Sequence, residues 1–392
     1  MRLSESRHLG SNPSPAANLS EIILLKLPRM ANNNLTNAKR AKNDEFYTQY
    51  LDIEKEVAAY LEYNPDVFRG KTILLPCDDP EWSNFTKFFA QNFDRFGLKK
   101  LISTSYAADS KTYKGDYQPT LFETKNPRFD KTKTTKNGKI FILTGDKTGD
   151  GAVDVNDLEW RYLEGDGDFR SDEIKKLRDE ADIIITNPPF SLFREFWLWL
   201  VESKKQFLII GNINAITYKE VFPLLKENKV WLGNNYKVNG GAMFYEIPED
   251  LANMEQVRKV KTDGAGKKVY ITRVQGVRWF TNIDHGRRHQ PLPLMTEAEV
   301  IKFVTKKPFE KYENYDAIEV SLVKNTPSDY KGVIGVPVSF LDKYSPKQFE
   351  IIGASDNGAV GEKYKLPHFK KHNEPYVNGQ KQYKRIFIKH KK

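Results

Sequence analysis

Residues 181–190, with the sequence ADIIITNPPF, constrain the fold of this chain more than any other stretch. The four apolar or β-branched residues at 183–186 are bounded by Asp182 and by a proline pair, which is typical of a strand buried in a parallel sheet. An aromatic segment of helical length follows at residues 191–203. Because ligand sites of open α/β sheets lie at the carboxyl ends of their strands, we expect a site at residues 187–190.

The residue types of this turn suit chemistry on an amino group attached to a flat ring. Such a nitrogen is a poor nucleophile, because its lone pair is delocalised, and two hydrogen-bond acceptors would free that lone pair. The side-chain oxygen of Asn187 and the carbonyl of Pro188 can supply them, since proline holds the turn rigid. Phe190 offers a face on which an extruded base can stack. The alternative is a Pro-Pro connection between strand and helix, with Phe190 in the core.

Composition narrows the classes of protein. A length of 392 residues suggests about two domains, and 39% hydrophobic residues are sufficient for real cores. The net charge of +10 and the pI of about 9.2 favour a polyanionic partner. Cys77 is the single cysteine, which excludes an intrachain disulfide, and no apolar run approaches the ~18 residues of a membrane span. We therefore expect a cytoplasmic protein.

The order of strand and helix patterns predicts a doubly wound α/β sheet. The expected strands lie at residues 71–75, 99–104, 139–143, 183–186, 206–211 and 229–233, and the expected helices follow Tyr50 or lie at residues 83–93, 171–180 and 191–203. Residues 107–140 are polar and rich in Lys and Thr, which predicts a long surface insertion.

Composition also divides the chain into three parts. Residues 1–33 are expected to form a disordered N-terminal extension. Residues 34–250 carry the strand and helix patterns of a catalytic domain, with a boundary near 245–255. Residues 251–392 contain short polar strands interleaved with Arg, Lys and aromatics, and end in a basic tail from residue 361. That tail either contacts a polyanion or is a solvated, solubilising end.

Further motifs accompany the Asn-Pro-Pro-Phe turn: DEFYTQY at 44–50, PCDDP at 76–80 followed by SNF at 83–85, GDF at 167–169, and RWFTN at 278–282. Together they resemble the EcoRI-type adenine-specific DNA methyltransferase family, over most of the chain from residue 30 onward. The resemblance implies a Rossmann-like doubly wound methyltransferase sheet, with a C-terminal mixed α+β target-recognition region. It also implies the γ-like motif order, with cofactor motifs first, the catalytic turn next and the recognition region last.

The resemblance implies a sequence-specific DNA adenine-N6 methyltransferase that uses S-adenosylmethionine and flips its target base out of double-stranded DNA. A restriction endonuclease acting on the same site is a second implied partner, unless the enzyme is solitary or phage-borne. No metal is expected. The implied catalytic residues are Asn187, Pro188 and Phe190; the implied cofactor contacts are Tyr47, Thr48, Pro76, Cys77, Asp78, Asp79, Asp168 and Phe169; and the implied DNA contacts are Arg278, Trp279, Asn282, Arg287, Arg288 and His289.

Several of these residues have structural alternatives. Tyr47 and Thr48 are also suited to beginning the following helix, and Cys77 to being a small buried hydrophobe. Asp168 is equally placed to cap the helix that follows Ser171. The basic and aromatic residues at 278–289 are compatible with packing and phosphate contacts that read no sequence.

The sequence departs from the usual superfamily pattern in two places. The first cofactor loop, residues 76–85, contains no glycine, so it must approach its ligand by another route. Asp78 or Asp79 is then the candidate acceptor for hydroxyl or amino hydrogens of the cofactor. The acidic residue that usually ends the second strand is absent from residues 102–106.

Other functions stay open at this point. One is methylation of structured RNA or of a glutamine side chain, and another is a DNA-binding relative that has lost catalysis. Cytosine-N4 methylation is a nearer rival, but such enzymes usually carry Ser at the position of Asn187. The acidic loop at residues 146–157 has the spacing of a calcium loop, yet Thr148 and Asp157 depart from it at positions 3 and 12, which favours a solvated turn.

Overall fold

The computed structural model describes residues 47–78, 83–107, 124, 127–151, 153, 157–234, 242–247, 257–262, 268–355 and 374–391. The expected N-terminal extension, Asp79, residues 361–373 of the basic tail, and about half of the insertion at 107–140 lie outside these residues. Among the described residues, no helix has the length and apolar content needed to cross a membrane.

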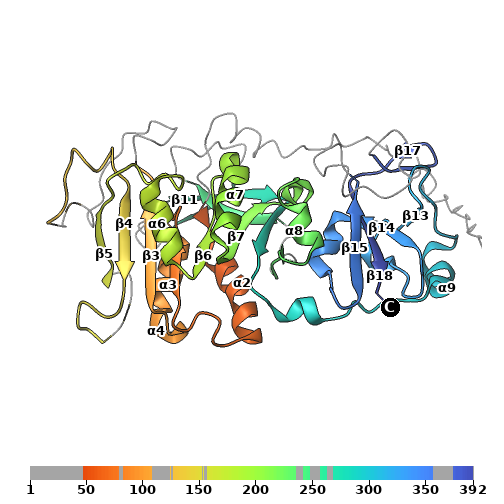
Figure 1. Ribbon diagram of the computed structural model, residues 1–392, viewed down its shortest axis with the longest axis horizontal. Coiled ribbons are helices and arrows are strands. Elements are labelled where there is room, and N and C mark those ends of the chain that lie inside the picture. The colour runs from red at the N-terminus through yellow and green to blue at the C-terminus, as the bar shows by residue number, and fades with distance from the viewer. Residues whose placement is uncertain are drawn as a thin grey trace, which may run out of the picture.

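A central eight-stranded sheet has the order β5-β4-β3-β2-β6-β7-β12-β8 (Figure 1). Strands β2, β3, β6 and β7 are parallel to one another, whereas β4 is antiparallel to β3, and β12 to β7. The bounds are β2 (Thr72–Leu75), β3 (Lys100–Ser105), β4 (Lys139–Leu143), β5 (Glu159–Tyr162), β6 (Ile183–Thr186), β7 (Gln206–Asn212), β8 (Trp231–Leu232) and β12 (Val277–Thr281). The predicted Rossmann-like α/β class is confirmed.

The order of the parallel strands places the switch point of the sheet between β2 and β6. The chain winds from β2 outward to β3, and β6 then pairs on the other side of β2. Crevices that bind ligands in doubly wound sheets open at the carboxyl ends of the two strands that flank such a point. The fold therefore brings together the loop after Leu75 and the turn after Thr186.

Helices cover both faces of this sheet. Because side chains alternate along a strand, Ile183 and Ile185 face one apolar cluster and Ile184 faces the other. Helices α2 (Tyr50–Tyr63), α3 (Asn84–Gln91) and α4 (Phe93–Phe96) contribute to the first cluster, and α6 (Asp172–Glu180), α7 (Phe193–Ser203) and α8 (Phe222–Lys226) to the second. Burial on both faces explains why β6 is apolar as far as its last residue, Thr186.

The helix starts follow local capping chemistry. Ser83 accepts a hydrogen bond from the backbone N–H of Phe85 at the start of α3, and Ser171 accepts one from Ile174 at the start of α6. A serine at this position satisfies a backbone donor that the helix itself cannot. Both helices were predicted from sequence, and their starts agree with the predicted ranges.

Two smaller sheets flank the central one. The first has the order β1-β9-β11-β10 and runs from β1 (Tyr47–Thr48) through β9 (Ala242–Ile247), β10 (Val257–Thr262) and β11 (Lys268–Gln275). The second has the order β13-β14-β18-β15, with β13 (Ala317–Glu319), β14 (Val333–Pro337), β15 (Phe349–Ala354) and β18 (Arg385–His390). Helix α8 lies between the central sheet and β15 in Figure 1, and the Lys226 ammonium donates to the carbonyl of Ile352 at 2.8 Å.

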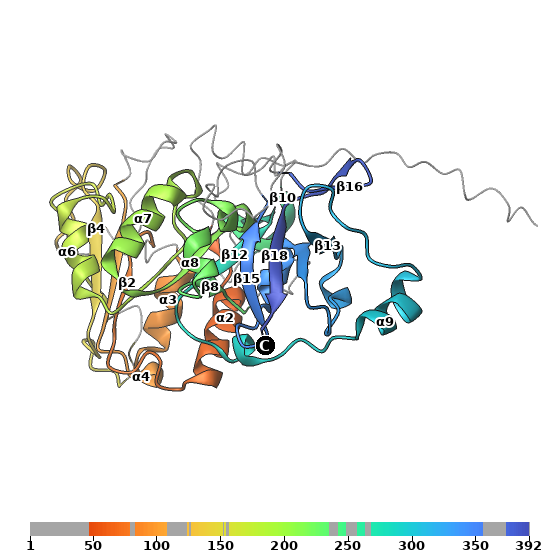
Figure 2. The ribbon, with the colours of Figure 1, turned by 45° about the vertical axis from the view of Figure 1, so that its right-hand side comes forward.

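Short elements complete the chain. They are η3 (Phe190–Leu192), η4 (Ile213–Thr217), η7 (Gly286–His289), α9 (Glu297–Val300), η8 (Ile301–Thr305), η9 (Val323–Asn325), η10 (Val338–Lys343), β16 (Tyr376–Val377) and β17 (Gln380–Lys381). Figure 2 shows α9 at the far end of the C-terminal part, away from the central sheet.

Strand β12 lies beyond the predicted boundary near 245–255, yet it occupies the place between β7 and β8 in the central sheet. The division into residues 34–250 and 251–392 stays a prediction for the chain as a whole. The topology adds that the later part supplies one strand of the catalytic sheet, since β11 passes directly into β12 through Gly276, which has φ +71°.

A buried ion pair joins the central sheet to the C-terminal part. The Arg278 guanidinium on β12 donates to both carboxylate oxygens of Asp342 in η10, at 2.6 and 3.0 Å. The two side chains are 10% and 3% exposed. Desolvation raises the pKa of Asp342 against the opposing effect of Arg278. Removing one member of such a pair leaves a charge that the interior cannot solvate.

We expect Asp342→Ala to lower the free energy of unfolding by roughly 3 kcal/mol, because Arg278 stays buried without its carboxylate. Urea unfolding followed by circular dichroism measures this. The control is Glu180→Ala, which removes the more exposed ion pair with Lys100 and should cost less than about 1 kcal/mol. Equal losses in the two variants would contradict a special role for the buried pair.

Candidate active site

The candidate site forms where the loop after β2 meets the turn after β6. The Asp78 carboxylate links the two segments, since its Oδ2 atom accepts a hydrogen bond from the Thr186 hydroxyl at 2.6 Å. Its Oδ1 atom accepts one from the Ser83 hydroxyl at 2.7 Å. Asp78 is only 4% exposed. A carboxylate held by two hydroxyls in the interior fixes the loop against the residue that immediately precedes Asn187.

Hydroxyl groups also hold the backbone of this loop. Thr104 donates to the carbonyl of Pro76 at 2.9 Å, and Thr86 donates to the carbonyl of Asp78 at 3.2 Å. The Ser103 hydroxyl also donates to the Asp78 carbonyl, and the Asp78 N–H donates to the carbonyl of Thr104 at 3.1 Å. The loop after β2 is thus shaped by side chains of β3 and α3, which accounts for the absence of glycine from it.

Strand β1 brings Thr48 to the same loop. The Asn84 amide, at the start of α3, donates to the carbonyl of Thr48 at 2.8 Å. Thr48 is 2% exposed, and its hydroxyl oxygen has no hydrogen-bond partner among the described residues. The sequence left open that Tyr47 and Thr48 begin the next helix, but they form a strand and α2 starts at Tyr50.

Burying a hydroxyl without a hydrogen bond lowers the stability of the fold, unless a ligand supplies the missing hydrogen bond. Thr48 therefore fits a small polar ligand bound beside the loop after β2. The side chain of Tyr47 lies outside the described residues, and so does Asp79.

Two glycines place Asp168 beside the carboxyl end of β3. Gly167 has φ +87°, and a Cβ atom there would lie 2.3 Å from the carbonyl oxygen of Ser105. A Cβ on Gly138 would lie 2.6 Å from the same oxygen. Only glycine permits this crossing of three backbone segments. Glycines thus allow backbone segments to approach closely at the end of β3. The usual superfamily pattern has its glycines in the loop after β2, the neighbouring strand.

The Asp168 carboxylate is paired with Arg170, whose guanidinium donates to it at 2.5, 2.9 and 3.2 Å. Burial raises the pKa of Asp168, but the hydrogen bonds and charge of Arg170 outweigh burial and hold that pKa below its ordinary value. Arg170 also donates to Glu195 at 2.8 Å. Ser171 rather than Asp168 caps α6, so the capping alternative for Asp168 is wrong.

The Asn-Pro-Pro-Phe turn, the predicted catalytic segment, follows β6 without a break. Asn187 and Pro189 are half-buried, whereas Pro188 is buried and Phe190 is 4% exposed. The amide oxygen of Asn187 is shielded from solvent. Phe190 begins η3 and packs in the apolar cluster of α2 and α3. Its ring can stack on a base only after the turn has opened.

Two predicted cofactor residues have packing roles in the structure. Phe169 is 4% exposed and meets the rings of Phe196 and Trp199 edge-on, with centroids 5.1 and 5.8 Å away. Cys77 is half-buried and packs on the same core cluster. Burial, and then the charge of Asp78, raise the pKa of the Cys77 thiol, so it stays protonated at neutral pH.

Three of the predicted DNA contacts lie within the central sheet. Trp279 is 1% exposed, and its ring meets that of Phe85 at 5.8 Å. Arg278 is committed to Asp342, as described above. Asn282 accepts the N–H of residue 207 at 2.7 Å and donates to the carbonyl of residue 205 at 3.0 Å. These contacts stabilise β12 and its junction with β7, and they place no side chain at the carboxyl ends of β2 and β6.

The other three predicted contacts surround Asp284. Arg288 and His289 each bind its carboxylate at 2.9 Å, and Arg288 is only 6% exposed. Arg287 donates to the carbonyl of Asn234 at 2.5 Å. Because β12 is antiparallel to β7, residues that follow β12 lie at the amino end of β7, opposite the catalytic turn. The structure therefore places Arg287, Arg288 and His289 at the edge opposite the candidate site, and engages Arg278, Trp279 and Asn282 in contacts within and beside the central sheet.

The acidic loop at residues 146–157 is closed by its own hydrogen bonds. Asp146 accepts the backbone N–H groups of Gly149 and Gly151, and Asp157 accepts those of Lys147 and Thr148. No group of three or more His, Cys, Asp or Glu side chains suited to a metal occurs among the described residues.

A doubly wound sheet that carries an Asn-Pro-Pro-Phe turn at its switch point defines a Rossmann-like methyltransferase. The family model described as "Adenine-specific methyltransferase EcoRI" matches residues 34–391. The chain therefore belongs to the family of EcoRI adenine-specific methyltransferases and is an enzyme of that class.

Three curated relatives support this membership. The chain is 40% identical over 369 residues to "Type II methyltransferase M.EcoRI" of Escherichia coli, covering 93% of this chain and 99% of that protein. It is 36% identical over 322 residues to "Type II methyltransferase M.MpnI" of Mycoplasma pneumoniae, covering 82% and 85%. It is 35% identical over 358 residues to "Type II methyltransferase M.MgeORF184P" of Mycoplasma genitalium, covering 90% and 97%. No solved structure matches it.

Sequence reasoning missed the residues that hold the site together. The sequence predicts Thr186 only as part of a buried strand, and Ser103 and Thr104 only as part of the strand at residues 99–104. A signal was available, because a hydroxyl residue at the end of an otherwise apolar buried strand needs a partner. The partner itself, Asp78, lies 108 residues away from Thr186 and was not identifiable from local pattern.

We expect Thr186→Val to lower kcat for methyl transfer by about tenfold or more, because a hydrogen bond to a charged group contributes about 1.5–3 kcal/mol. Valine keeps the shape of the side chain but cannot bind Asp78. Thr186→Ser keeps the hydroxyl and should restore most of the rate. Single-turnover methylation measures both, and equal rates for the Val and Ser variants would contradict the role of the Asp78 contact.

Proposed function

We propose that this enzyme transfers a methyl group from S-adenosylmethionine to N6 of an adenine that has been flipped out of double-stranded DNA at a specific sequence. The observation that carries the proposal is the contact between Asp78 and Thr186. It holds the loop after β2 and the catalytic turn after β6 side by side at the switch point of the sheet.

The cofactor side of the proposed site consists of Thr48, Pro76, Cys77, Asp78 and Asp168. The Thr48 hydroxyl, which is buried and has no hydrogen-bond partner in the part of the chain that the structure describes, would be completed by a polar group of the cofactor. Asp78 would act by holding the loop, since both of its carboxylate oxygens accept protein hydroxyls. Asp168 stays ionised and so can accept hydroxyl or amino hydrogens. When bound, S-adenosylmethionine supplies an electrophilic methyl group.

The base side consists of the turn itself. Asn187 and the carbonyl of Pro188 would accept the two amino hydrogens of adenine and so make its lone pair available for attack. Phe190 would stack on the base once the turn has opened, because its ring is buried in the structure described here. Positioning and preorganised hydrogen-bond acceptors supply the rate enhancement. The proton lost from the amino group passes to solvent.

The net charge of +10 and the printed names of the relatives, all of them Type II methyltransferases, support DNA as the substrate. We propose that the enzyme is the modification half of a restriction system, with an endonuclease that cleaves the same unmethylated sequence, or a solitary or phage-borne relative. Mapping N6-methyladenine across the genome of a methylation-free host that expresses this chain tests the reaction and gives the sequence. Modified RNA or modified protein glutamine, with unmodified DNA, would favour the alternative substrates.

We expect Asn187→Ala to lower kcat by about 100-fold or more, because it removes one of two acceptors aimed at the reacting amino group. Binding of S-adenosylmethionine, measured by calorimetry, should not change. The control is Asn64→Ala, at the exposed end of α2 far from the turn, which should methylate DNA normally. A wild-type rate for Asn187→Ala would refute the proposed chemistry, and absence of cofactor binding by the wild-type chain would favour a relative without catalysis.

A further inference from the structure

The surface that reads DNA must border the edge of the sheet at which the flipped base enters. In Figure 1 the yellow strand β4 runs downward, so the strands parallel to β3 end at the upper edge. Residues 285–289, which the sequence singled out, lie at the opposite edge. Strand β7 has 7 residues, so roughly 23 Å separates the two edges at about 3.3 Å per residue. A different part of the chain must therefore contact the bases beside the target.

The hairpin formed by β16 and β17 lies above the C-terminal sheet, on the same upper side of the molecule as the carboxyl ends of the central strands (Figure 1). Its two turn residues, Asn378 and Gly379, have φ +49° and +71°, as a two-residue hairpin turn of type I′ requires. The residues from Asn378 to Lys381 are exposed, and Tyr383 is 52% exposed. The hairpin carries the exposed Gln380, and Gln382 follows it; Gln382 is half-buried, and its side-chain amide donates to the carbonyl of Gln380 at 3.3 Å. A glutamine side chain carries both a donor and an acceptor.

Two contacts connect this segment to the catalytic sheet. The Tyr383 hydroxyl donates to the side-chain oxygen of Asn214 at 3.2 Å, and the Lys384 ammonium donates to the hydroxyl of Thr217 at 3.0 Å. Asn214 and Thr217 belong to η4, which follows directly on β7. Residues 383 and 384, just after the hairpin, therefore border the carboxyl end of a strand that neighbours β6.

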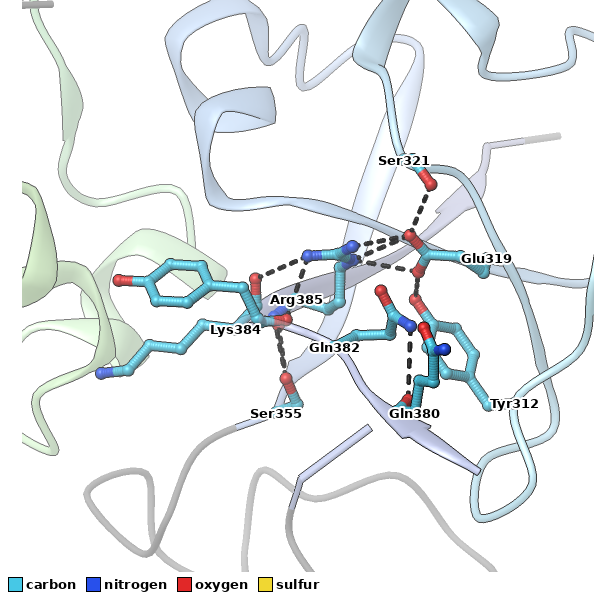
Figure 3. A network of polar contacts seen from close by, with 9 residues as sticks. Tyr312, Glu319, Ser321, Ser355, Gln380, Gln382, Lys384 and Arg385 are labelled. Carbon is cyan, nitrogen blue, oxygen red and sulfur yellow. Dashed lines mark hydrogen bonds and ion pairs between the residues drawn. The ribbon is translucent and has the colours of Figure 1, made fainter. Parts of the chain in front are cut away.

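A buried network holds the base of the segment in place, as Figure 3 shows. The Arg385 guanidinium donates to both oxygens of Glu319 at 2.6 and 2.9 Å, and the Tyr312 hydroxyl donates to the same carboxylate. The backbone N–H of Arg385 donates to the Ser355 hydroxyl at 2.8 Å. The Arg385 and Glu319 side chains are 9% and 5% exposed. Rigid support of this kind is what precise recognition requires.

The hairpin itself is tied to the loop before β13. Asn314 donates to the carbonyl of Glu374 at 2.7 Å and accepts the N–H of Tyr376 at 3.2 Å. Glu313 accepts the N–H of Gly379 at 2.5 Å. The exposed amide of Gln380 is thus presented from a fixed backbone.

Two exposed cations lie near the Asn-Pro-Pro-Phe turn, one at the start of α7 and one between η4 and α8. The Arg194 guanidinium lies over the ring of Tyr218 at 4.2 Å and is exposed, and Lys219 is also exposed. Two carboxylates are close by: Glu195 is bound by Arg170, and Glu220 lies 3.8 Å from Lys219. Arg194 is therefore the cation that the described geometry offers to a phosphate group.

We propose that residues 378–384 read base edges in the major groove beside the flipped adenine, with Gln380 and Gln382 as specificity-determining residues and Arg194 as a phosphate contact. Two-stranded ribbons fit the major groove, and glutamine pairs bidentately with adenine there. This inference rests on the proposed function and adds to it the surface that selects the sequence.

The test begins with the sequence that the wild-type enzyme methylates, found in the methylation-free host. If no DNA is methylated, the proposed function fails before the hairpin is tested. The double variant Gln380→Ala, Gln382→Ala is then assayed on duplexes with the cognate site and with each single-base change. We expect kcat/KM on the cognate site to fall about 10- to 100-fold and discrimination to be lost at one or two positions. Cofactor binding should be unchanged.

The matched control is Gln290→Ala, an exposed glutamine at the opposite edge, which should leave both rate and discrimination unchanged. Arg194→Ala should weaken binding to all sequences and reduce the salt dependence by about one phosphate contact, whereas Arg287→Ala should not. Unchanged discrimination in the hairpin variant would overturn the proposal, as would lost discrimination in Gln290→Ala or Arg287→Ala. If the double variant does not fold, the single variant Gln380→Ala, at an exposed residue, is assayed for discrimination on the same duplexes.

Discussion

The hydrogen bond between Asp78 and Thr186 is the contact on which the rest of the site depends. It joins two loops that the order of the strands brings next to each other, and without it the switch point would be only two adjacent strand ends. The carboxylate lies in the interior, so its two hydroxyl partners are needed to make its burial tolerable. The same requirement fixes the rotamer of Thr186 and, through the backbone, the start of the catalytic turn. The same contact therefore makes the burial of the carboxylate tolerable and holds the turn at the end of β6 in place.

The sequence predicted what depends on local pattern. The isoleucines of β6 and the serine caps of α3 and α6 each leave a signal within a few residues, and the structure has these elements where they were predicted. It did not predict the direction of β4 or the place of β12, because strand pairing between distant segments leaves no local trace. Arg278 is the clearest case, since an arginine in a basic and aromatic segment suggests nucleic acid until its carboxylate partner is known.

Net charge likewise says less about a partner than the burial of individual cations does. Arg278, Arg288 and Arg385 are each less than a tenth exposed and are bound to carboxylates within the chain. They hold the chain together and contribute little to the attraction of a polyanion at its surface. The cations that matter for association are the exposed ones, and among the described residues Arg194 stands near the catalytic turn. A charge count therefore supports nucleic acid as a partner without locating the interface.

The position of β12 has a consequence for the nascent chain. Strand β7 pairs with β12 from Leu208 to Asn212, yet β12 begins at Val277, 65 residues after Asn212 in the chain. During translation β7 therefore emerges with an open edge, which is a template for pairing with other chains. This edge is covered only after β12 has been synthesised, and β12 follows the strands β9, β10 and β11 of the small sheet in the chain. The central sheet is therefore completed late in translation. In a host with little chaperone capacity, we expect the exposed edge of β7 to cause aggregation of the nascent chain, and not a loss of activity of the folded enzyme.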